Sequence, residues 1–427
     1  MSGTNGLHTP PFAPSENRDD RAETRTTPEV FSAVLFETMK RINAGIEGLE
    51  LHEFRYALEN VTPVPCDLQS KSNRDYHEDG WNTIELDKQE EIERLIGSRD
   101  FYSGIQLKPR SGDRIVLDKN IVRLTRMLFA GLVSGNYSED WVKAHFYFDI
   151  RGFYFLPRTV YFTETVLAHF GGEPYKCFEQ RQKRFERFQD IGYKDFKETN
   201  TEIDQAFVES VKKLINGRGT PVLIALAGPT AAGKTEITER LLKTFEQTGM
   251  KSTTIEVDNF LLDREYRDEK PMGKESTHFE LFMRSLVEIL QGNKIIIPRY
   301  DFVSATSSHD LNGNLKTGCS PIEIEPADII FMEGNFPFQM EEISGLIGIK
   351  AVYLTDDPVR LKRKWKRDID YRKKYDPAYF RNRFFRTQFL RAEDCYLPLM
   401  EGCDIVVDTT GAALWATPEI VEILNRD

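Results

Sequence analysis

The fold of this chain is decided by one stretch, VLIALAGPTAAGKT, which spans residues 222–235. Its second half fits the pattern G-x-x-x-x-G-K-[ST] at every position, from Gly228 to Thr235. The apolar run Val222–Ala227 in front of it predicts a buried strand, and the amphipathic run Glu236–Phe245 behind it predicts a helix. This order of strand, glycine-rich loop and helix favours a phosphate-binding loop over a chance match in a glycine-rich turn.

The residue types in this loop suit the binding of phosphate oxygens. Glycine lets the backbone curl and point its N–H groups inward, and the following helix adds the positive end of its dipole. The Lys234 ammonium can neutralise the β- and γ-phosphates, and the Thr235 hydroxyl can ligate Mg²⁺. We therefore predict ATP and Mg²⁺ as cofactors. The predicted nucleotide-binding residues are Gly228, Thr230, Ala231, Ala232, Gly233, Lys234 and Thr235.

The sequence changes character near residue 200. From Pro221 onward, short apolar runs alternate with helical stretches, which is typical of βαβ units and a parallel sheet. We predict an α/β fold in which residues 200–427 form a P-loop NTPase kinase domain with a parallel sheet. An N-terminal α+β domain of unknown role, residues 27–198, precedes it, and residues 1–26 are predicted to be a disordered tail.

The N-terminal region has helical patterns and one aromatic run. A helix is expected to begin at Pro28 and end by Gly45, and others are expected near Lys88–Ile96 and Lys119–Leu132. Aromatic and β-branched residues between 146 and 162 predict two strands around a central proline.

Two acidic residues follow predicted strands in the C-terminal half. Asp258 ends the β-rich run Thr253–Val257 and could accept a proton from a hydroxyl or hold Mg²⁺ through water; capping of the next turn is the alternative. Four apolar residues lead from Asp328 to Glu333, which places Glu333 within reach of the metal and makes Asp328 structural. No N-K-x-D guanine motif occurs in the sequence, which favours a small-molecule kinase over a GTPase.

The run 359–374 is intensely basic inside an acidic chain. A solvated helix face is the ordinary interpretation of such a run. Kinases, however, need cations over the transferred phosphoryl group, so Arg367 and Arg372 are the leading candidates, with Lys364 and Lys374 behind them. Further arginines, which could receive a phosphate on the acceptor, follow at Arg381, Arg383, Arg386 and Arg391.

Residues 221–408 resemble the uridine kinase and phosphoribulokinase-like group of P-loop kinases. The matching pieces, in the family's order, are the loop 228–235, VDNF at 257–260, PRYDF at 298–302, FMEG at 331–334, the basic lid at 363–372 and YLP at 396–398. The resemblance implies that Asp258 is the general base. It also implies that Arg367 and Arg372 belong to a lid over the phosphates and that Tyr300 lies by the acceptor.

The residues expected near the acceptor differ from those of uridine kinases. They follow the Tyr-Asp-Phe stretch with a histidine and an arginine, where this chain has Ala305 and Ser307. We also assign Arg264 to the acceptor side. His278 is assigned there too, although capping of a helix start is an equal alternative for it. The acceptor is therefore left as a nucleoside, a sugar or a related metabolite.

The composition limits partners and location. The net charge of −11 disfavours nucleic acid and anionic membranes as partners. No apolar run approaches the roughly 18 residues of a membrane span, and five widely spaced cysteines argue against a disulfide scaffold or a zinc site. The chain starts without a secretory pattern, so a cytoplasmic location is expected. A homo-oligomer through the N-terminal domain is one possibility.

The leading hypothesis is an enzyme, an ATP-dependent phosphotransferase that acts on a hydroxyl of a small metabolite. Lys234, Arg367 and Arg372 would neutralise the γ-phosphoryl group and Asp258 would take the proton, while Thr235, Glu333 and Asp258 are the candidate metal ligands. A nucleotide-sensing module without turnover is the alternative, and a kinase of macromolecules is a third.

Overall fold

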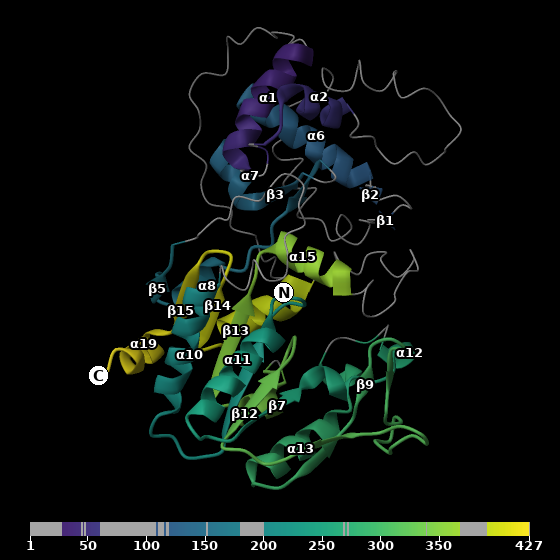
Figure 1. The fold of residues 1–427 in the computed structure, drawn as a ribbon, viewed down its shortest axis with the longest axis vertical. Coiled ribbons are helices and arrows are strands. Elements are labelled where there is room, and N and C mark those ends of the chain that lie inside the picture. Colours follow the sequence, from purple (N-terminus) through teal and green to yellow (C-terminus); the bar gives the residue numbers. More distant parts are fainter. Residues whose placement is uncertain are drawn as a thin grey trace, which may run out of the picture.

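The computed structural model describes residues 28–43, 46, 48–59, 108–109, 115–116, 119–150, 153–179, 200–267, 270, 273–338, 340–367 and 391–426. Several predictions lie outside these residues: the tail 1–26, the helix Lys88–Ile96, Arg372, Lys374 and the arginines 381–386. The described residues form two lobes, with the N-terminal lobe above the larger C-terminal lobe in Figure 1.

A mixed, mostly parallel sheet forms the centre of the C-terminal lobe, which confirms the predicted α/β fold class. Its seven strands run in the order β5-β15-β14-β13-β6-β12-β7. Those from β14 to β7 are parallel, and β15 and β5 are antiparallel additions at one edge. The strands are β5 (Lys176–Cys177), β6 (Val222–Ala227), β7 (Ser252–Glu256), β12 (Ile329–Glu333), β13 (Ile349–Leu354), β14 (Ile405–Asp408) and β15 (Ala413–Ala416).

Helices cover both faces of this sheet because successive side chains of the buried strands point to opposite faces. On β6, Val222, Ile224 and Leu226 join one core, and Leu223, Ala225 and Ala227 join the other. The first core includes α10 (Thr201–Ile215), α11 (Lys234–Gln247) and α19 (Pro418–Leu424). The second includes α8 (Glu164–His169), α13 (Phe279–Leu290) and α18 (Leu397–Glu401).

The excursion between β7 and β12 contains several short elements. They are a 3-10 turn (Val257–Phe260), α12 (Arg264–Arg267), a second 3-10 turn (Lys274–Ser276), and the antiparallel pairs β8 (Ile295–Ile297) with β11 (Ile322–Ile324) and β9 (Tyr300–Asp301) with β10 (Thr306–Ser307). After β12 come α14 (Glu341–Ser344) and α15 (Asp357–Lys366), and a π-helical turn (Ala392–Tyr396) leads into α18.

The N-terminal lobe has its own aromatic core. It contains α1 (Pro28–Ile42), α2 (Leu51–Glu59), α6 (Lys119–Ser134), α7 (Glu139–His145), the hairpin β3 (Phe146–Asp149) with β4 (Tyr154–Pro157), and the small pair β1 (Lys108–Pro109) with β2 (Ile115–Val116). The predicted helices at 28 and 119 are confirmed. The two predicted strands do not flank Pro157: it is the last residue of β4, because a proline has no N–H to extend the ladder.

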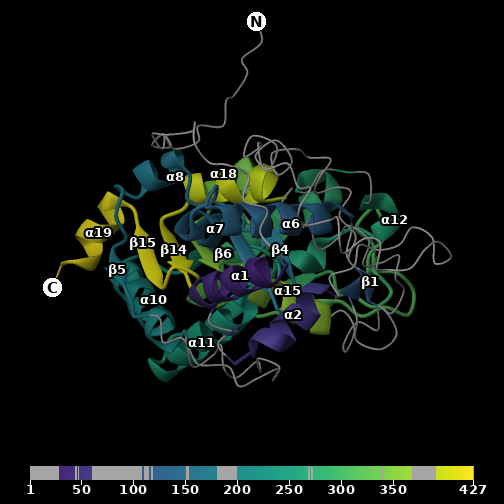
Figure 2. The same ribbon diagram turned by 90° about the horizontal axis from the view of Figure 1, so that it is seen from above.

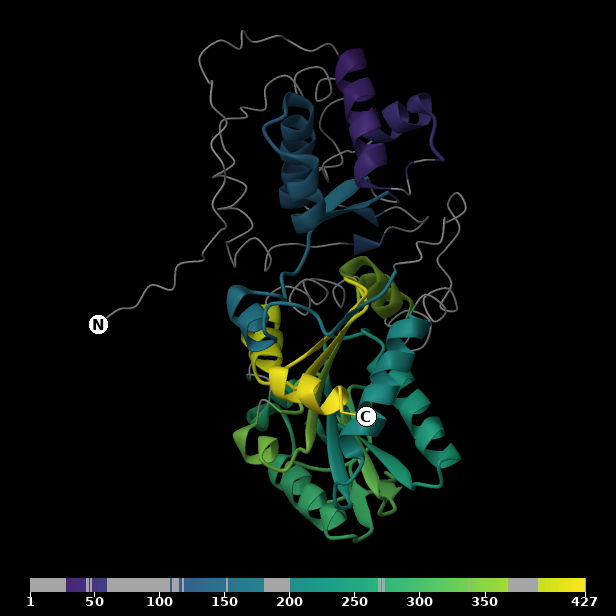
Figure 3. The same ribbon diagram turned by 90° about the vertical axis from the view of Figure 1, so that its left-hand side faces the viewer.

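The chain crosses between the lobes just after β4. Residues 158–163 have no regular structure, and the next two elements, α8 and β5, already lie with the C-terminal sheet. Figure 2 shows α8 beside α18 and β5 beside β15, and Figure 3 shows the blue α8 segment in the lower lobe. Among the described residues, none of the helices has the length and apolar character needed to cross a membrane.

Candidate functional site

The loop after β6 lies where parallel strands end and α11 begins. Gly228 packs so close to β13 that a Cβ there would overlap the Tyr353 carbonyl oxygen, so only glycine fits. Gly233 has φ 109°, and Ala231 also has a positive φ of 61°. Lys234 is the first residue of α11, so the backbone amides of this helix start face the loop. The geometry is that of a phosphate-binding loop.

Lys234 reaches back over this loop. Its ammonium donates to the carbonyl oxygens of Gly228 at 3.0 Å and Pro229 at 3.2 Å, and to Asn335 Oδ1 at 3.2 Å. Burial lowers the pKa of Lys234 to about 8, and the nearby carboxylates of Glu333 and Asp258 oppose that shift. The ammonium therefore remains mostly charged near neutral pH, held by weak acceptors that a phosphate can replace.

Glu333 ends β12 beside the start of α11. The Thr235 hydroxyl donates to its Oε1 at 2.7 Å, and its Oε2 is buried without a hydrogen-bond partner in the described part of the chain. Burial raises the pKa of Glu333 to about 7, while Lys234 and the Thr235 hydroxyl act to lower it.

This oxygen set fits a divalent cation. A buried carboxylate oxygen without a partner, next to a threonine hydroxyl, suits Mg²⁺, which prefers oxygen ligands and keeps several waters. Among the residues that the structure describes, no group of three or more His, Cys, Asp or Glu side chains is placed to hold a metal ion by itself. A metal at Thr235 and Glu333 would share its ligands with phosphate oxygens.

Asp258 lies at the same edge of the sheet. On β7, Glu256 is opposite Glu333 of β12, and Glu333 is in turn opposite Leu226 of β6. Asp258 follows β7 by two residues, in a 3-10 turn, and is half-buried. Its carboxylate acts on the pKa of both Lys234 and Glu333, which places it in their electrostatic neighbourhood.

The helix α15 lies against the loop with its basic side. Arg360 donates to the Thr230 carbonyl oxygen and Arg363 to that of Ala232, both at 3.5 Å, and Arg367 donates to Thr230 Oγ1 at 3.3 Å. These arginines are spaced by three and four residues, so they share one face of the helix. The basic run thus contacts the loop through this face instead of forming only a solvated surface.

The tyrosine predicted at the acceptor is placed by two neighbours. Tyr300 is buried, and its hydroxyl accepts a hydrogen bond of 2.6 Å from Arg267, whose guanidinium also lies 5.2 Å from the ring centre. The Tyr300 backbone N–H donates to Asn259 Oδ1 at 3.1 Å, which ties the tyrosine to the turn that contains Asp258.

His278 and Arg264 lie on the same side of the lobe. His278 precedes α13, but its ring does not cap that helix; Nε2 is 3.1 Å from Ser307 Oγ instead. Burial lowers the pKa of His278 to about 4, so the ring is neutral at physiological pH. Arg264 begins α12 and its backbone N–H donates to the Ala305 carbonyl oxygen at 3.0 Å.

A cavity of about 250 Å³ opens beside His278. Its walls are Leu262, Asp263, Tyr266, His278, His309, Asp310, Leu311, Asn312 and Lys316. Lys316 forms an ion pair of 2.7 Å with Asp263, and a turn at Asn312-Gly313 closes one side, with Gly313 at φ 80°. The mixture of neutral imidazole, ion pair and amide suits a small polar molecule.

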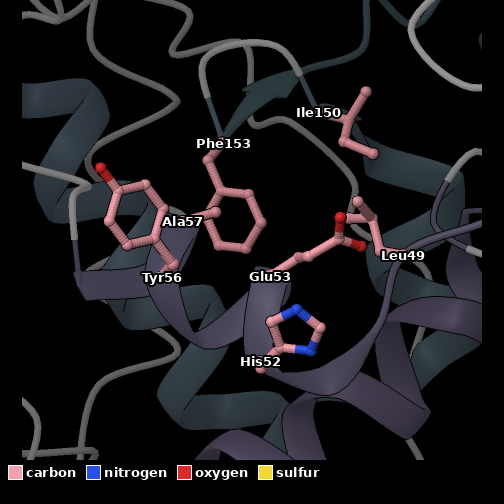
Figure 4. Close-up of a pocket in the computed structure, with 7 residues that line it drawn as sticks. All are labelled: Leu49, His52, Glu53, Tyr56, Ala57, Ile150 and Phe153. Carbon is pink, nitrogen blue, oxygen red and sulfur yellow. The ribbon is translucent and has the colours of Figure 1, made fainter.

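A larger cavity, about 540 Å³, lies in the N-terminal lobe. Figure 4 shows side chains of α2, including His52, Glu53 and Tyr56, around the space below Ile150 and Phe153. None of the predicted site residues lines this cavity. The predicted residues in the described part of the chain gather instead at the strand ends of the C-terminal lobe.

Several contacts were not selected from the sequence. Arg360 and Arg363 touch the loop, although the leading candidates from the basic run were Arg367 and Arg372, followed by Lys364 and Lys374; their shared helix face was the available signal. Asn335 holds Lys234, and Arg267 holds Tyr300, through contacts that no local pattern indicates.

Comparison with known proteins identifies a family for the C-terminal part of the chain. Residues 223–413 match the model of the Phosphoribulokinase / Uridine kinase family. A uridine kinase of Brevibacillus brevis is 31% identical over 162 residues, which cover 36% of this chain and 69% of that protein. Uridine-cytidine kinase 2-B of Danio rerio is 27% identical over 222 residues, which cover 48% and 81%. Among solved structures, D-glycerate 3-kinase of Cryptococcus neoformans matches with a TM-score of 0.24 and 15% identity, covering 48% of this chain and 71% of that one.

Proposed function

Because the chain belongs to the phosphoribulokinase / uridine kinase family, we propose that it transfers the γ-phosphoryl group of ATP to a hydroxyl of a small metabolite. The observation that supports this most is the meeting of three groups at one sheet edge: Lys234 after β6, Glu333 at the end of β12 and Asp258 after β7. Phosphoryl transfer needs little covalent help from a protein, so positioning and charge neutralisation are the tasks these groups must perform.

The loop and α15 bind the nucleotide. When phosphates enter, Lys234 exchanges its carbonyl acceptors for phosphate oxygens, and Arg367 lies within reach of the same space through its contact with Thr230. Arg372 continues the basic run beyond Arg367 and is proposed to act with it. Thr235 and Glu333 would hold Mg²⁺ or its waters, and the cation would supply further neutralisation of the phosphate charge.

Asp258 receives the proton of the acceptor. A hydroxyl attacks poorly while protonated, and a carboxylate at hydrogen-bonding distance both orients it and accepts its proton as the bond to phosphorus forms. Asp258 suits this role because it is half-buried in the turn after β7, in the electrostatic neighbourhood of cationic Lys234. Tyr300 and Asn259 are linked to the same turn and would position the acceptor.

The acceptor is a small polar alcohol. The cavity next to His278 has room for a molecule of sugar or nucleoside size, and its walls offer both donors and acceptors. In this chain, Ala305 and Ser307 contact Arg264 and His278, so the positions that uridine kinases use for the base are engaged with the protein itself. We therefore favour a sugar-like acceptor over uridine.

An acceptor screen with ADP release as the readout tests the proposal. The full-length protein is incubated with ATP·Mg²⁺ and single nucleosides, sugars or sugar acids. We expect one of these classes of compound to raise ADP release above the rate measured without an acceptor. Identical rates with every acceptor would count against a metabolite kinase.

A nucleotide sensor is the second candidate. It is favoured by one observation: Tyr300 and His278, the proposed acceptor contacts, are already hydrogen-bonded to Arg267 and Ser307. A sensor would bind ATP with ordinary affinity and release no ADP in the same screen.

A further inference from the structure

The segment that joins the lobes is fastened to the first turn of α15. Arg158 forms an ion pair of 3.1 Å with Asp356, and the Thr159 backbone N–H donates to Asp357 Oδ2 at 2.8 Å. The same arginine also donates to the carbonyl oxygen of Phe146 at 2.9 Å, in the β3–β4 hairpin. The N-terminal lobe, the joining segment and α15 are therefore connected by successive hydrogen bonds.

Arg360 extends this connection to the nucleotide loop. Its side chain is 1% exposed, and Nη2 donates to the Tyr161 hydroxyl at 3.0 Å and to Asp357 Oδ1 at 2.6 Å. Its Nε donates to the Thr355 carbonyl oxygen at 3.1 Å, and Nη1 reaches the Thr230 carbonyl oxygen. Asp357 thus shares its two oxygens between the joining segment and Arg360.

We infer that Arg158, Thr159 and Tyr161 support the nucleotide site, with Tyr161 and Arg158 acting as positioning residues that hold Arg360 and the start of α15 against the loop. The inference rests on the proposed function only in taking loop 228–235 as the ATP site. It assigns the N-terminal lobe a role that the family match, which begins at residue 223, does not include.

Burial explains why these contacts matter. A guanidinium in the interior must keep its N–H donors hydrogen-bonded, because a buried donor without an acceptor destabilises the folded protein. Arg360 can stay in place only while Tyr161, Asp357 and Thr355 accept its hydrogen bonds. Loss of one acceptor would move the Arg360 side chain or let water reach it. The contact with the Thr230 carbonyl oxygen is the longest of the set, at 3.5 Å, and would be lost first.

The variant Tyr161→Phe tests the inference. It keeps the ring, which packs 6.4 Å from that of Tyr396, and removes only the hydroxyl. Val160→Ala, in the adjacent and 55% exposed position, is the matched control. ATP·Mg²⁺ affinity is measured by calorimetry on the full-length protein, at a temperature where circular dichroism shows every variant folded. We expect about tenfold weaker binding for Tyr161→Phe, or ~1.4 kcal/mol, and no change for Val160→Ala.

A second pair of variants tests the link to the N-terminal lobe. Arg158→Gln breaks the ion pair to Asp356, and Arg41→Gln breaks an ion pair of 2.6 Å to Glu139 within the N-terminal lobe. We expect Arg158→Gln to weaken ATP binding about threefold and Arg41→Gln to leave it unchanged.

The outcomes separate the two proposals. Wild-type affinity in both Tyr161→Phe and Arg158→Gln, with or without a lower unfolding midpoint, would overturn the positioning role and leave only structural contacts. A wild-type protein that does not bind ATP·Mg²⁺ would instead overturn the proposed function. Binding without acceptor-dependent turnover leaves the positioning inference standing and favours the sensor.

Discussion

At the scale of single residues, the site depends on charged groups that lie close together at one edge of a sheet. Lys234 and Glu333 are pulled by burial toward their neutral forms and toward their charged forms by each other. Asp258, two residues beyond β7, acts on the pKa of both. Lys234 and Glu333 therefore change their proton affinities together, and a nucleotide with its cation would add charges of both signs beside them.

Asp258→Asn should separate binding from turnover. The amide keeps the shape of the carboxylate but cannot accept a proton, so turnover should fall about 10²- to 10⁴-fold. ATP affinity should change little, because the proposed nucleotide contacts come from the loop and α15 and not from Asp258. Steady-state rates and calorimetry measure the two quantities. A parallel loss of both would show that the aspartate has a structural role.

Glu333 should make the Mg²⁺ requirement depend on pH. Its pKa is raised to about 7, so the carboxylate is progressively protonated below that pH and loses its attraction for a cation. The Mg²⁺ concentration for half-maximal activity should rise as pH falls from about 8 to 6, by up to about tenfold per unit below the pKa. The same measurement on Glu333→Gln, which has no titrating carboxylate at this position, gives the part of the pH dependence that comes from the nucleotide itself. Equal pH dependence in the two proteins would contradict this role of Glu333.

At the scale of elements, the site requires β6 and β13 to approach each other at Gly228. Gly228→Ala places a methyl group against the Tyr353 carbonyl oxygen and forces the strands apart. We expect a loss of about 1–3 kcal/mol in the free energy of unfolding, together with loss of ATP binding.

Gly345→Ala is the control for this substitution. Gly345 has φ −70° and nothing within 4 Å of an added Cβ, so this variant should be neutral or slightly stabilised. Chemical denaturation of both variants measures the difference. Equal stability of the two would refute the close approach at Gly228.

Some helices and strands of this fold could be predicted from the sequence and others could not. Val222–Ala227 was predicted with the bounds that the structure has, and the helices at Pro28 and Lys119 with their first residues, because buried parallel strands and amphipathic helices have strong patterns. The antiparallel edge made by β15 and β5 was not predicted. Its partner strands lie more than 200 residues apart, with Ala413 opposite Cys177, and a two-residue strand has no period to detect.

The candidate site residues could be predicted where they stand at a fixed spacing from a strand in the sequence. The loop residues from Gly228 to Thr235 and the acids after two strands could be chosen because each follows an apolar run. Arg360 could not be chosen over its basic neighbours, since its partner Tyr161 is 199 residues away in sequence. Contacts of this kind are made by tertiary packing and leave no local signal.

At the scale of the whole molecule, α15 lies between the two lobes, above the sheet in Figure 1. One end of it is tied to residues 158–161 and its arginines contact the loop. A ligand that orders the loop should therefore also order the joining segment, because both belong to one hydrogen-bonded unit.

Hydrogen exchange can detect this coupling. ATP·Mg²⁺ should slow amide exchange in 228–235 and also in 158–163, including the Thr159 amide that donates to Asp357. Amides of β8 and β11, which form a separate two-stranded sheet, should serve as the unchanged reference. Protection confined to the loop would mean that the lobes respond independently.

Transfer of a phosphoryl group from ATP to a small alcohol is tested by following the phosphate itself. The full-length protein is incubated with ATP labelled at the γ-phosphate, Mg²⁺ and a metabolite extract separated by size. We expect label on a molecule in the small fraction, in a stable phosphate ester, and almost none with Asp258→Asn. Label found only in ATP, in free phosphate or on macromolecules, while ATP binds normally, would contradict it.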